Sequence, residues 1–201
     1  MIEAAQQLGV TLASEQVQQL ERYLDLLIKW NRVYNLTAIR DRQRMVTHHI
    51  HDSLSVLPYL QGERVIDLGS GAGLPGIPAA LIHPQQQVVM LDSNVKKSRF
   101  IQQAILELGL SNASVVHSRV EQYVPEQPFN TVVSRAFTSL TQFLQFAHPL
   151  LVSGGVAVAM KGHWPESEGD GVMDGFELEQ VVPLSVPGIE AVRHLIICRK
   201  S

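Results

Sequence analysis

An apolar segment that runs directly into four closely spaced glycines constrains this chain more than any other feature. Residues 64–76 read Arg-Val-Ile-Asp-Leu-Gly-Ser-Gly-Ala-Gly-Leu-Pro-Gly, and the first five suit a buried strand. Glycine tolerates positive φ and lets a ligand approach the backbone without a Cβ in the way. A strand that feeds such a loop and then a helix is how an α/β sheet binds a nucleotide-like cofactor. The segment therefore predicts a cofactor loop, although Gly71-x-Gly73-x-x-Gly76 also satisfies the dinucleotide fingerprint.

The rest of the chain alternates between strand and helix in a way that extends this sheet. Strands are predicted near residues 64–68, 87–92, 113–117, 129–134 and 155–160, and helices near 75–82, 94–108, 119–123 and 139–151. Such alternation implies a parallel sheet with helices on both faces. Two further strands, 177–184 and 191–199, are too close in sequence for a crossover helix and should pair antiparallel. Residues 162–175 are expected to form an exposed loop.

The first third of the chain is predicted to be helical. No strand signal precedes residue 64, so residues 1–62 should form a helical cap on a 63–201 core within a single 1–201 domain. Ser14 is a predicted N-cap, and a second helix should cover roughly residues 42–60. On that helix His48 and His51 should share a face while His49 points elsewhere, so no metal site is expected.

Composition indicates where the protein acts and what kind of partner it binds. The chain has one cysteine and no run of the roughly 18 apolar residues that a membrane helix requires. It does not open with a basic and then apolar leader, so a cytoplasmic protein is expected. No coiled-coil signal is present, and we expect a monomer without a protein partner. The net charge is −3, but residues 22–52 hold six Arg or Lys against three acids, which suits docking of a polyanion.

Two aspartates beside the glycines separate two classes of cofactor. Asp67 lies two residues before Gly69, where a carboxylate would repel a pyrophosphate but suits the ammonium and sulfonium of S-adenosylmethionine. Alternatively, Asp67 organises the turn. Asp92 ends the second strand, where it can accept both ribose hydroxyls or cap the next helix. Together with the antiparallel tail, these residues favour a methyltransferase over an NAD(P)-dependent oxidoreductase.

Two cations end later strands of the predicted sheet. Arg135 follows the fourth strand, and a guanidinium there requires partners if it is buried. It is a candidate to contact the methionine carboxylate or the target base, with an exposed strand end as the alternative. Lys161 ends the fifth strand at the same edge, either as a substrate or phosphate contact or as a solvated lysine.

Several segments together resemble one family over nearly the whole chain. They are Trp30-Asn31-x3-Asn35-Leu36-Thr37-Ala38-Ile39, His49-x2-Asp52-Ser53-Leu54, Asp67 through Pro78, Ser134-Arg135-Ala136 and Lys161-Gly162. This set is similar to the bacterial small-subunit ribosomal RNA guanine-N7 methyltransferases, the glucose-inhibited division protein B family of class I S-adenosylmethionine-dependent methyltransferases. The resemblance implies a Rossmann-like sheet of five parallel strands and an antiparallel C-terminal hairpin, seven strands in all, preceded by the helical cap.

The resemblance also implies an activity, namely methyl transfer to N7 of guanine-527 in the 530 loop of 16S rRNA. The substrate would be the 16S rRNA or the small ribosomal subunit. The transfer would need no obligatory general base, because N7 carries a lone pair and no proton. Arg135 would act by positioning or by electrostatic stabilisation. The alternatives are a methyltransferase acting on another RNA or on a protein, an NAD(P)-binding oxidoreductase, and a non-catalytic RNA-binding protein.

The implied site residues form two sets. The S-adenosyl-L-methionine set contains Asp67, Gly69, Gly71, Gly73, Leu74, Asp92, Val120, Glu121 and Arg135. The RNA-binding set contains Arg32, Asn35, Arg40, Arg42, Arg44, His48, His49 and Lys161.

Overall fold

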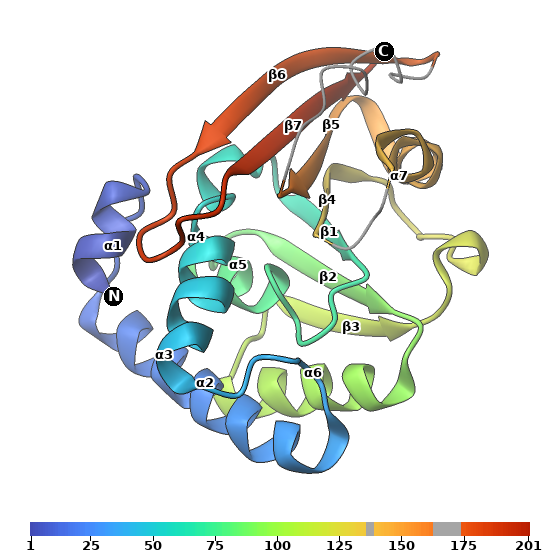
Figure 1. Cartoon of the computed structure of the whole chain (residues 1–201). Helices are drawn as coiled ribbons and strands as arrows, with labels where there is room; N and C mark the ends of the chain where they lie inside the picture. Colours follow the sequence, from blue (N-terminus) through green and yellow to red (C-terminus); the bar gives the residue numbers. More distant parts are fainter. Residues whose placement is uncertain (136–138, 163–173) are drawn as a thin grey trace.

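A seven-stranded sheet in the order β3-β2-β1-β4-β5-β7-β6 forms the centre of the computed structural model (Figure 1). The structure describes residues 1–135, 139–162 and 174–201, so most of the predicted 162–175 loop, together with Ala136, lies outside the described residues. The strands are β1 (Arg64–Leu68), β2 (Gln87–Asp92), β3 (Ala113–His117), β4 (Phe129–Ser134), β5 (Leu151–Lys161), β6 (Phe176–Leu184) and β7 (Arg193–Lys200).

The first five strands are parallel, and β7 runs antiparallel to both β5 and β6. The predicted Rossmann-like methyltransferase sheet with a C-terminal hairpin is therefore confirmed. The strand order reverses between β1 and β4, which is the switch point where open α/β sheets bind their ligands. Because Lys161 pairs with His194, the amino end of β7 lies at the same sheet edge as the carboxyl ends of the parallel strands.

Helices that follow the parallel strands cover both faces of the sheet. They are α5 (Gly76–Ile82), α6 (Val95–Leu108), α7 (Leu140–Ala147) and the 3₁₀ turns η3 (Val120–Gln122) and η4 (His148–Leu150). Asn94 caps α6 by accepting hydrogen bonds from the next turn, and Gly109 ends that helix with a φ of +66°. β5 begins at Leu151 rather than at residue 155, because α7 ends at Ala147 and the His-Pro turn leads directly into the strand.

The N-terminal segment is helical, as predicted, but its second half is not one continuous helix. It contains α1 (Ile2–Gln7), α2 (Ser14–Tyr34), α3 (Arg42–Met45), the π-helix η1 (Val46–His51), α4 (Asp52–Leu54) and the 3₁₀ turn η2 (Leu57–Tyr59). The predicted N-cap at Ser14 is wrong by one residue: Ala13 is the N-cap, and its backbone N–H donates to Gln16 Oε1 at 2.9 Å. In the described part of the chain, no helix is long and apolar enough to cross a membrane.

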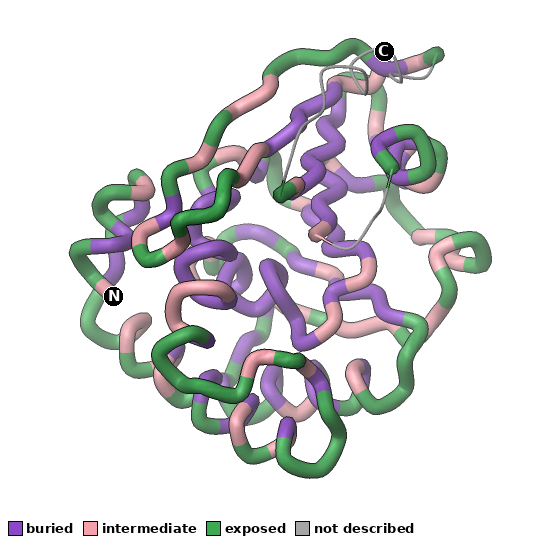
Figure 2. Tube along the Cα trace, viewed as in Figure 1, coloured by how far each residue is buried: buried purple, intermediate pink, exposed green. Residues whose placement is uncertain are grey.

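One hydrophobic cluster joins the N-terminal helices to the sheet. Leu20, Tyr23 and Leu24 of α2 share it with Val65 of β1 and Met90 of β2. The opposite face of the sheet packs a second cluster against α7, and Figure 2 shows the buried strands between these layers. The Tyr23 hydroxyl also donates to the Ala72 carbonyl at 2.7 Å. A helix of the N-terminal segment is thus bonded directly to the glycine-rich loop.

Candidate active site

Two cavities divide the edge of the sheet where the parallel strands end. The first, the β1–β3 cavity, has about 410 Å³ and is lined by Gly69, Leu91, Asp92, Ser93, Lys97, Ser118, Arg119, Val120, Glu121, Gln142 and Phe146. The second, the β4–β7 cavity, has about 360 Å³ and is lined by Ile39, His48, His49, Asp52, Arg135, Met160, Lys161, Gly162 and Arg193. The switch point between β1 and β4 separates the strands that supply them.

The glycine-rich loop forms an open backbone surface beside the β1–β3 cavity. Gly69, Gly71 and Gly73 have φ values of +68°, +63° and +80°, which favour glycine. A Cβ at Gly73 would lie 2.7 Å from Ile77 Cγ1, so this position faces packed protein. A Cβ at Gly71 would meet nothing nearer than the Gly69 carbonyl oxygen at 4.0 Å. The loop is therefore packed against protein at Gly73 and free of close contacts at Gly71, where a ligand could approach the backbone.

Asp67 is fully buried beneath this loop. Its Oδ2 accepts a hydrogen bond from Gly76 N at 2.9 Å, which organises the turn, while Oδ1 has no hydrogen-bond partner in the described structure. Burial raises the pKa of Asp67 to about 6, even though the nearby charge of Arg135 lowers it. A buried carboxylate with an unpartnered oxygen is stabilised by a cation. This arrangement fits the positively charged end of S-adenosylmethionine.

Asp92 ties the loop to the next helix. Its Oδ2 accepts from Gly71 N and its Oδ1 accepts from Asn94 N, both at 2.8 Å. The capping alternative is therefore present in the structure, and each carboxylate oxygen retains a second lone pair for a ligand hydroxyl. Val120 and Glu121 line the same cavity. Leu74 is instead 1% exposed in the hydrophobic core and is not among the residues that line this cavity.

Arg135 has the buried partner that its position at the end of β4 requires. Its Nη1 donates to the His48 carbonyl and to Asp52 Oδ2, each at 3.3 Å. Arg193 Nε donates to the other carboxylate oxygen, Asp52 Oδ1, at 3.2 Å. The charge of Arg135 also lowers the pKa of Asp67 and of His49. Arg135 therefore lines the β4–β7 cavity at the end of β4, the strand that lies beside β1 at the switch point.

The three neighbouring histidines are arranged differently from the prediction. His48 and His49 both line the β4–β7 cavity, whereas His51 donates through Nδ1 to the Pro187 carbonyl at 2.9 Å. The expectation that His48 and His51 share a face is wrong, because the segment is a π-helix whose hydrogen bonds join residues five apart. Within residues 1–135, 139–162 and 174–201, no group of three or more His, Cys, Asp or Glu could hold a metal ion.

His49 belongs to a network that fixes the loop after α2. Its Nδ1 lies 3.1 Å from the His48 carbonyl oxygen and its Nε2 lies 2.9 Å from Thr37 Oγ1. Thr37 N in turn donates to Asn31 Oδ1 at 2.9 Å. Burial, assisted by the charge of Arg135, lowers the pKa of His49 to about 4. His49 is therefore neutral at pH 7, and the positive charge of this cavity comes from arginine and lysine.

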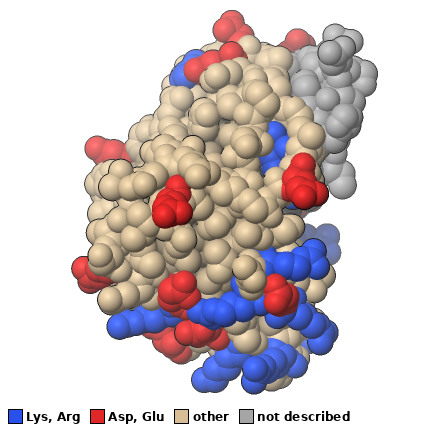
Figure 3. Space-filling view, turned by 60° about the vertical axis from the view of Figure 1, so that its left-hand side comes forward, with Lys and Arg blue, Asp and Glu red and all other residues tan. Residues whose placement is uncertain are grey.

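The remaining predicted RNA-binding residues lie on the surface of the N-terminal helices and of the segment between α2 and α3. Arg32 and Arg40 line a hollow of about 230 Å³, and Arg40 donates to Asn35 Oδ1 at 3.3 Å. Arg42 pairs with Glu21 and Asp25, so its charge is compensated, and Arg44 is exposed. Figure 3 shows Lys and Arg gathered over the lower part of one face, with acidic side chains among them.

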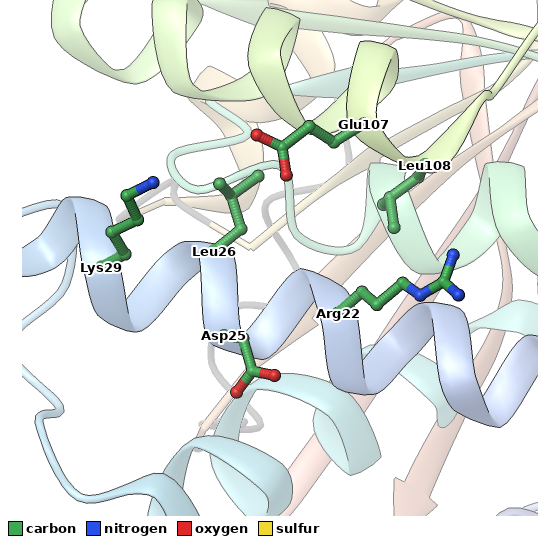
Figure 4. Close-up of a pocket in the computed structure, with 6 residues that line it drawn as sticks. All are labelled: Arg22, Asp25, Leu26, Lys29, Glu107 and Leu108. Atoms are coloured by element: carbon green, nitrogen blue, oxygen red, sulfur yellow. The ribbon is translucent and has the colours of Figure 1, made fainter.

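A third cavity lies between α2 and α6 and has a different character. It has about 270 Å³, and Arg22, Asp25, Leu26 and Lys29 of α2 line it opposite Glu107 and Leu108 of α6 (Figure 4). Its charges are mixed, and Asp25 points away from α6 toward Arg42. None of the glycine-loop residues lines it.

Sequence reasoning missed several residues that line the two main cavities. Arg193 is the most important of them, and it lies in a strand that carries no recognisable motif. Asp52 was visible in the His49-x2-Asp52 motif, but its role as the shared partner of two arginines was not. Gln142 and Phe146 reach the β1–β3 cavity from α7, and only their helical spacing signals that they face the same side.

Comparison with known proteins places this site in a family. The family model described as rRNA small subunit methyltransferase G matches residues 16–196. The ribosomal RNA small subunit methyltransferase G of Chromobacterium violaceum is 50% identical over 191 residues, covering 94% of this chain and 91% of that protein. The protein of the same name from Ectopseudomonas mendocina is 47% identical over 203 aligned positions, covering 100% of this chain and 95% of that protein.

Solved structures share the fold at much lower sequence identity. TrmN from Thermus thermophilus has a TM-score of 0.62 at 20% identity, covering 74% of this chain and 48% of that one. A SAM dependent methyltransferase from Aquifex aeolicus has a TM-score of 0.61 at 15% identity, covering 80% of this chain and 94% of that one. Sequence relatives and fold thus agree, and the chain belongs to the rRNA small subunit methyltransferase G family.

Proposed function

We propose that this protein transfers a methyl group from S-adenosylmethionine to N7 of a guanine in 16S rRNA, guanine-527 of the 530 loop. The main support is that two cavities of different character open on one sheet edge, with Arg135 lining one of them beside the switch point. The β1–β3 cavity adjoins a backbone loop shaped for a small cofactor, whereas two arginines and a lysine outnumber the one carboxylate among the described residues that line the other. Membership in the family supports ribosomal RNA as the substrate.

Residues around the β1–β3 cavity would hold the cofactor. Asp67, Gly69, Gly71 and Gly73 would face its methionine end, and Asp92 its ribose hydroxyls. Val120 and Glu121, at the end of β3, would contact the adenine ring. When bound, S-adenosylmethionine supplies an electrophilic methyl group on a sulfonium. Leu74 would support the loop from the core side rather than contact the cofactor, because it is buried there.

The chain's own residues have no proton to remove in this reaction. N7 of guanine offers a lone pair, so acceleration comes from positioning and electrostatics rather than from a general base. His49 is a weak base, since its pKa is lowered to about 4 and both its ring nitrogens lie within hydrogen-bond distance of protein atoms. Arg135 would bind an acceptor atom, either guanine O6 or the methionine carboxylate, while leaving N7 open. Ile39 and Met160 supply apolar surface to the same cavity.

The N-terminal helices would dock the RNA. Arg32, Arg40 and Arg44 carry the exposed positive charge of this surface, and His48 and Lys161 would contact the RNA at the cavity. Arg42 would contribute less, because two carboxylates compensate it. A 16S rRNA or small-subunit substrate places the proposed activity in the cytoplasm, and we propose that the protein acts as a monomer.

Mapping of N7-methylguanine in 16S rRNA tests this function directly. Reverse-transcription mapping of RNA from cells with and without the protein should show a single guanine in the 530 loop that loses its methyl group when the protein is absent. Transfer by the purified protein to 16S rRNA, small subunits, another RNA and a protein fraction then identifies the substrate. Unchanged methylation of the 530 loop in cells without the protein would contradict the proposal.

The assignment of Asp92 to the cofactor ribose has its own test. Asp92→Ala should weaken S-adenosylmethionine binding by about tenfold, because a charge-assisted hydrogen bond to a hydroxyl is lost together with the tie to Gly71 N. Titration calorimetry measures the affinity. An unchanged dissociation constant would restrict Asp92 to its capping role.

A further inference from the structure

Asp52 is a buried carboxylate shared by two arginines that lie far apart in the sequence. Its side chain is 7% exposed, and its two oxygens accept from Arg135 after β4 and from Arg193 at the start of β7. Burying charged groups is costly unless they are paired and hydrogen-bonded. Because a buried ion pair contributes little net stability, the pairing of two arginines with Asp52 suggests a functional role.

The helical segment that leads into Asp52 is held by the turn between β6 and β7. The π-helix that precedes it packs against the turn between β6 and β7: His51 donates to the Pro187 carbonyl. A Cβ at Gly188 of the same turn would lie 2.5 Å from Thr47 Cγ2, so this turn and the helix are in close contact. The hairpin that carries Arg193 is thus held against the helix that carries Asp52.

Both arginines keep donors for a ligand. A guanidinium has five N–H groups in a planar fork. Arg135 makes its hydrogen bonds through Nη1, and Arg193 makes its bonds through Nε and Nη1. The Nη2 groups of both have no acceptor within residues 1–135, 139–162 and 174–201, and both arginines line the β4–β7 cavity. Asp52 therefore holds part of each guanidinium and leaves part of each available.

We propose that Asp52 is a positioning residue that holds Arg135 and Arg193 together as a two-arginine binding unit for the target nucleotide. The inference rests on the proposed function for its substrate, an RNA nucleotide whose carbonyl and phosphate oxygens accept from guanidinium donors. Asp52 does not itself contact the substrate. It fixes the orientation of both arginines, and Arg193 adds a second contact to that of Arg135.

Asp52→Asn tests the role of the carboxylate, because it keeps the size of the side chain and removes its charge. Single-turnover methyl transfer to 16S rRNA at saturating S-adenosylmethionine should slow by about tenfold or more, since misplaced binding groups lose orientation. The KM for rRNA should not rise, because the cavity becomes more positive and the substrate is a polyanion. A folding defect would not separate the two quantities in this way.

A double-mutant cycle tests the coupling to Arg193. The effects of Asp52→Asn and Arg193→Gln on the transfer rate should be less than additive, because each variant removes the same contact. Arg199→Gln is the matched control: Arg199 lies on β7 as well, but it pairs with Glu179 and does not contact Asp52. Its effect should be small and additive with that of Asp52→Asn. Should Asp52→Asn fold poorly, Arg193→Lys removes the planar fork, keeps the charge, and should also slow transfer.

A measurement independent of activity separates this inference from the proposed function. Hydrogen exchange of the Arg193 Nε–H, followed by NMR, should be slow in the wild-type protein and faster in Asp52→Asn. Absence of methyl transfer by the wild-type protein would contradict the proposed function, and the exchange experiment would still decide the positioning role. Unchanged exchange, an unchanged rate in Asp52→Asn, or additive effects with Arg193→Gln would each overturn the inference.

Discussion

The two halves of the site are built by different means. The loop beside the β1–β3 cavity is fixed through backbone amides, because Asp67 accepts from Gly76 N, 9 residues away, and Asp92 accepts from Gly71 N, 21 residues away. The β4–β7 cavity is assembled from side chains of the π-helix region, the ends of β4 and β5, and the start of β7. One half is therefore organised by a loop whose backbone amides are held by carboxylates, and the other by charged side chains up to 141 residues apart.

The halves also differ in charge in a way that suits their proposed ligands. Asp67, Asp92 and Glu121 lie on the β1–β3 side, where Lys97 and Arg119 also line the cavity, so the charges there are mixed. A carboxylate favours a sulfonium and an ammonium. Arg135, Lys161 and Arg193 lie on the other side, with Asp52 as the carboxylate among the described lining residues. The excess of positive charge around the β4–β7 cavity would attract a polyanionic acceptor to that side of the switch point.

Removing Arg135, at the end of β4 beside the switch point, should have the largest effect. Arg135→Met is expected to slow methyl transfer about 100-fold, the loss typical of a preorganised charged donor. It also leaves Asp52 with only Arg193 as its ionic partner in the described structure. Single-turnover kinetics measure the loss, with Arg199→Gln as the control. A rate close to that of the control would show that Arg135 does not connect the halves functionally.

Two glycines of the loop should respond differently when a methyl group is added to each. Gly73→Ala should reduce the free energy of unfolding by about 3 kcal/mol, because it combines a positive φ with overpacking against Ile77. Gly71→Ala should reduce the free energy of unfolding by only about 1 kcal/mol. The positive φ of Gly71 is unfavourable for alanine, but the added Cβ meets open space. Gly71→Ala should nevertheless weaken S-adenosylmethionine binding more than tenfold by filling the cofactor position.

Urea unfolding and ligand titration on both glycine variants separate stability from binding. Equal stability losses in the two would contradict the distinction between a packed and an open side of the loop. Full cofactor affinity in Gly71→Ala would place the cofactor elsewhere.

The pH dependence of stability should depend on one buried titratable group from each half, Asp67 and His49. The pKa of Asp67 is raised to about 6 in the folded protein, so the stability linked to it is present below its unfolded value of 3.8 and is lost as the pH rises through 6. The pKa of His49 is lowered to about 4, so its linked stability is present above 6.5 and is lost as the pH falls through 4. Between about pH 4 and 6 the two contributions oppose each other.

Single substitutions should expose each contribution in turn. From pH 6.5 to pH 4, Asp67→Asn should lose about 2 kcal/mol more of its unfolding free energy than the wild-type protein. His49→Gln should change in the opposite sense, gaining relative to the wild-type protein over the same interval. Urea unfolding at a series of pH values measures both, and parallel curves for all three proteins would contradict the assigned shifts.

The smallest effect should distinguish two arginines on the RNA-docking surface. Arg40→Gln should reduce the slope of log Kd for rRNA against log salt by about one, as expected for one lost phosphate contact. Arg42→Gln should change that slope much less, because Glu21 and Asp25 already compensate its charge. Binding to 16S rRNA is measured for both variants over a range of salt concentrations. Equal slopes for the two variants would show that the ion pairs of Arg42 with Glu21 and Asp25 break when RNA binds.

The parts of the molecule that could be predicted are those that depend on short-range signals. Alternating strands and helices predicted the sheet, and the glycine spacing beside Asp67 predicted the open loop. The π-helix could not be predicted, because its i→i+5 bonds leave the same apolar pattern as a helix of ordinary pitch. Arg193 could not be predicted either, because its partner Asp52 lies 141 residues away. Leu74 was placed at the cofactor by resemblance, whereas its burial assigns it to the core.

The separation of 141 residues between Asp52 and Arg193 also has a consequence for the order in which parts of the site form during synthesis on the ribosome. The segment that carries Asp52 leaves the exit tunnel early, and β7 is the last strand to be synthesised. The strands beside the glycine loop, β1 and β2, are synthesised well before β7. The two-arginine unit exists only once the final strand has docked. The proposed contact of Arg193 with the target nucleotide would thus become available later than the RNA-docking surface of the N-terminal helices.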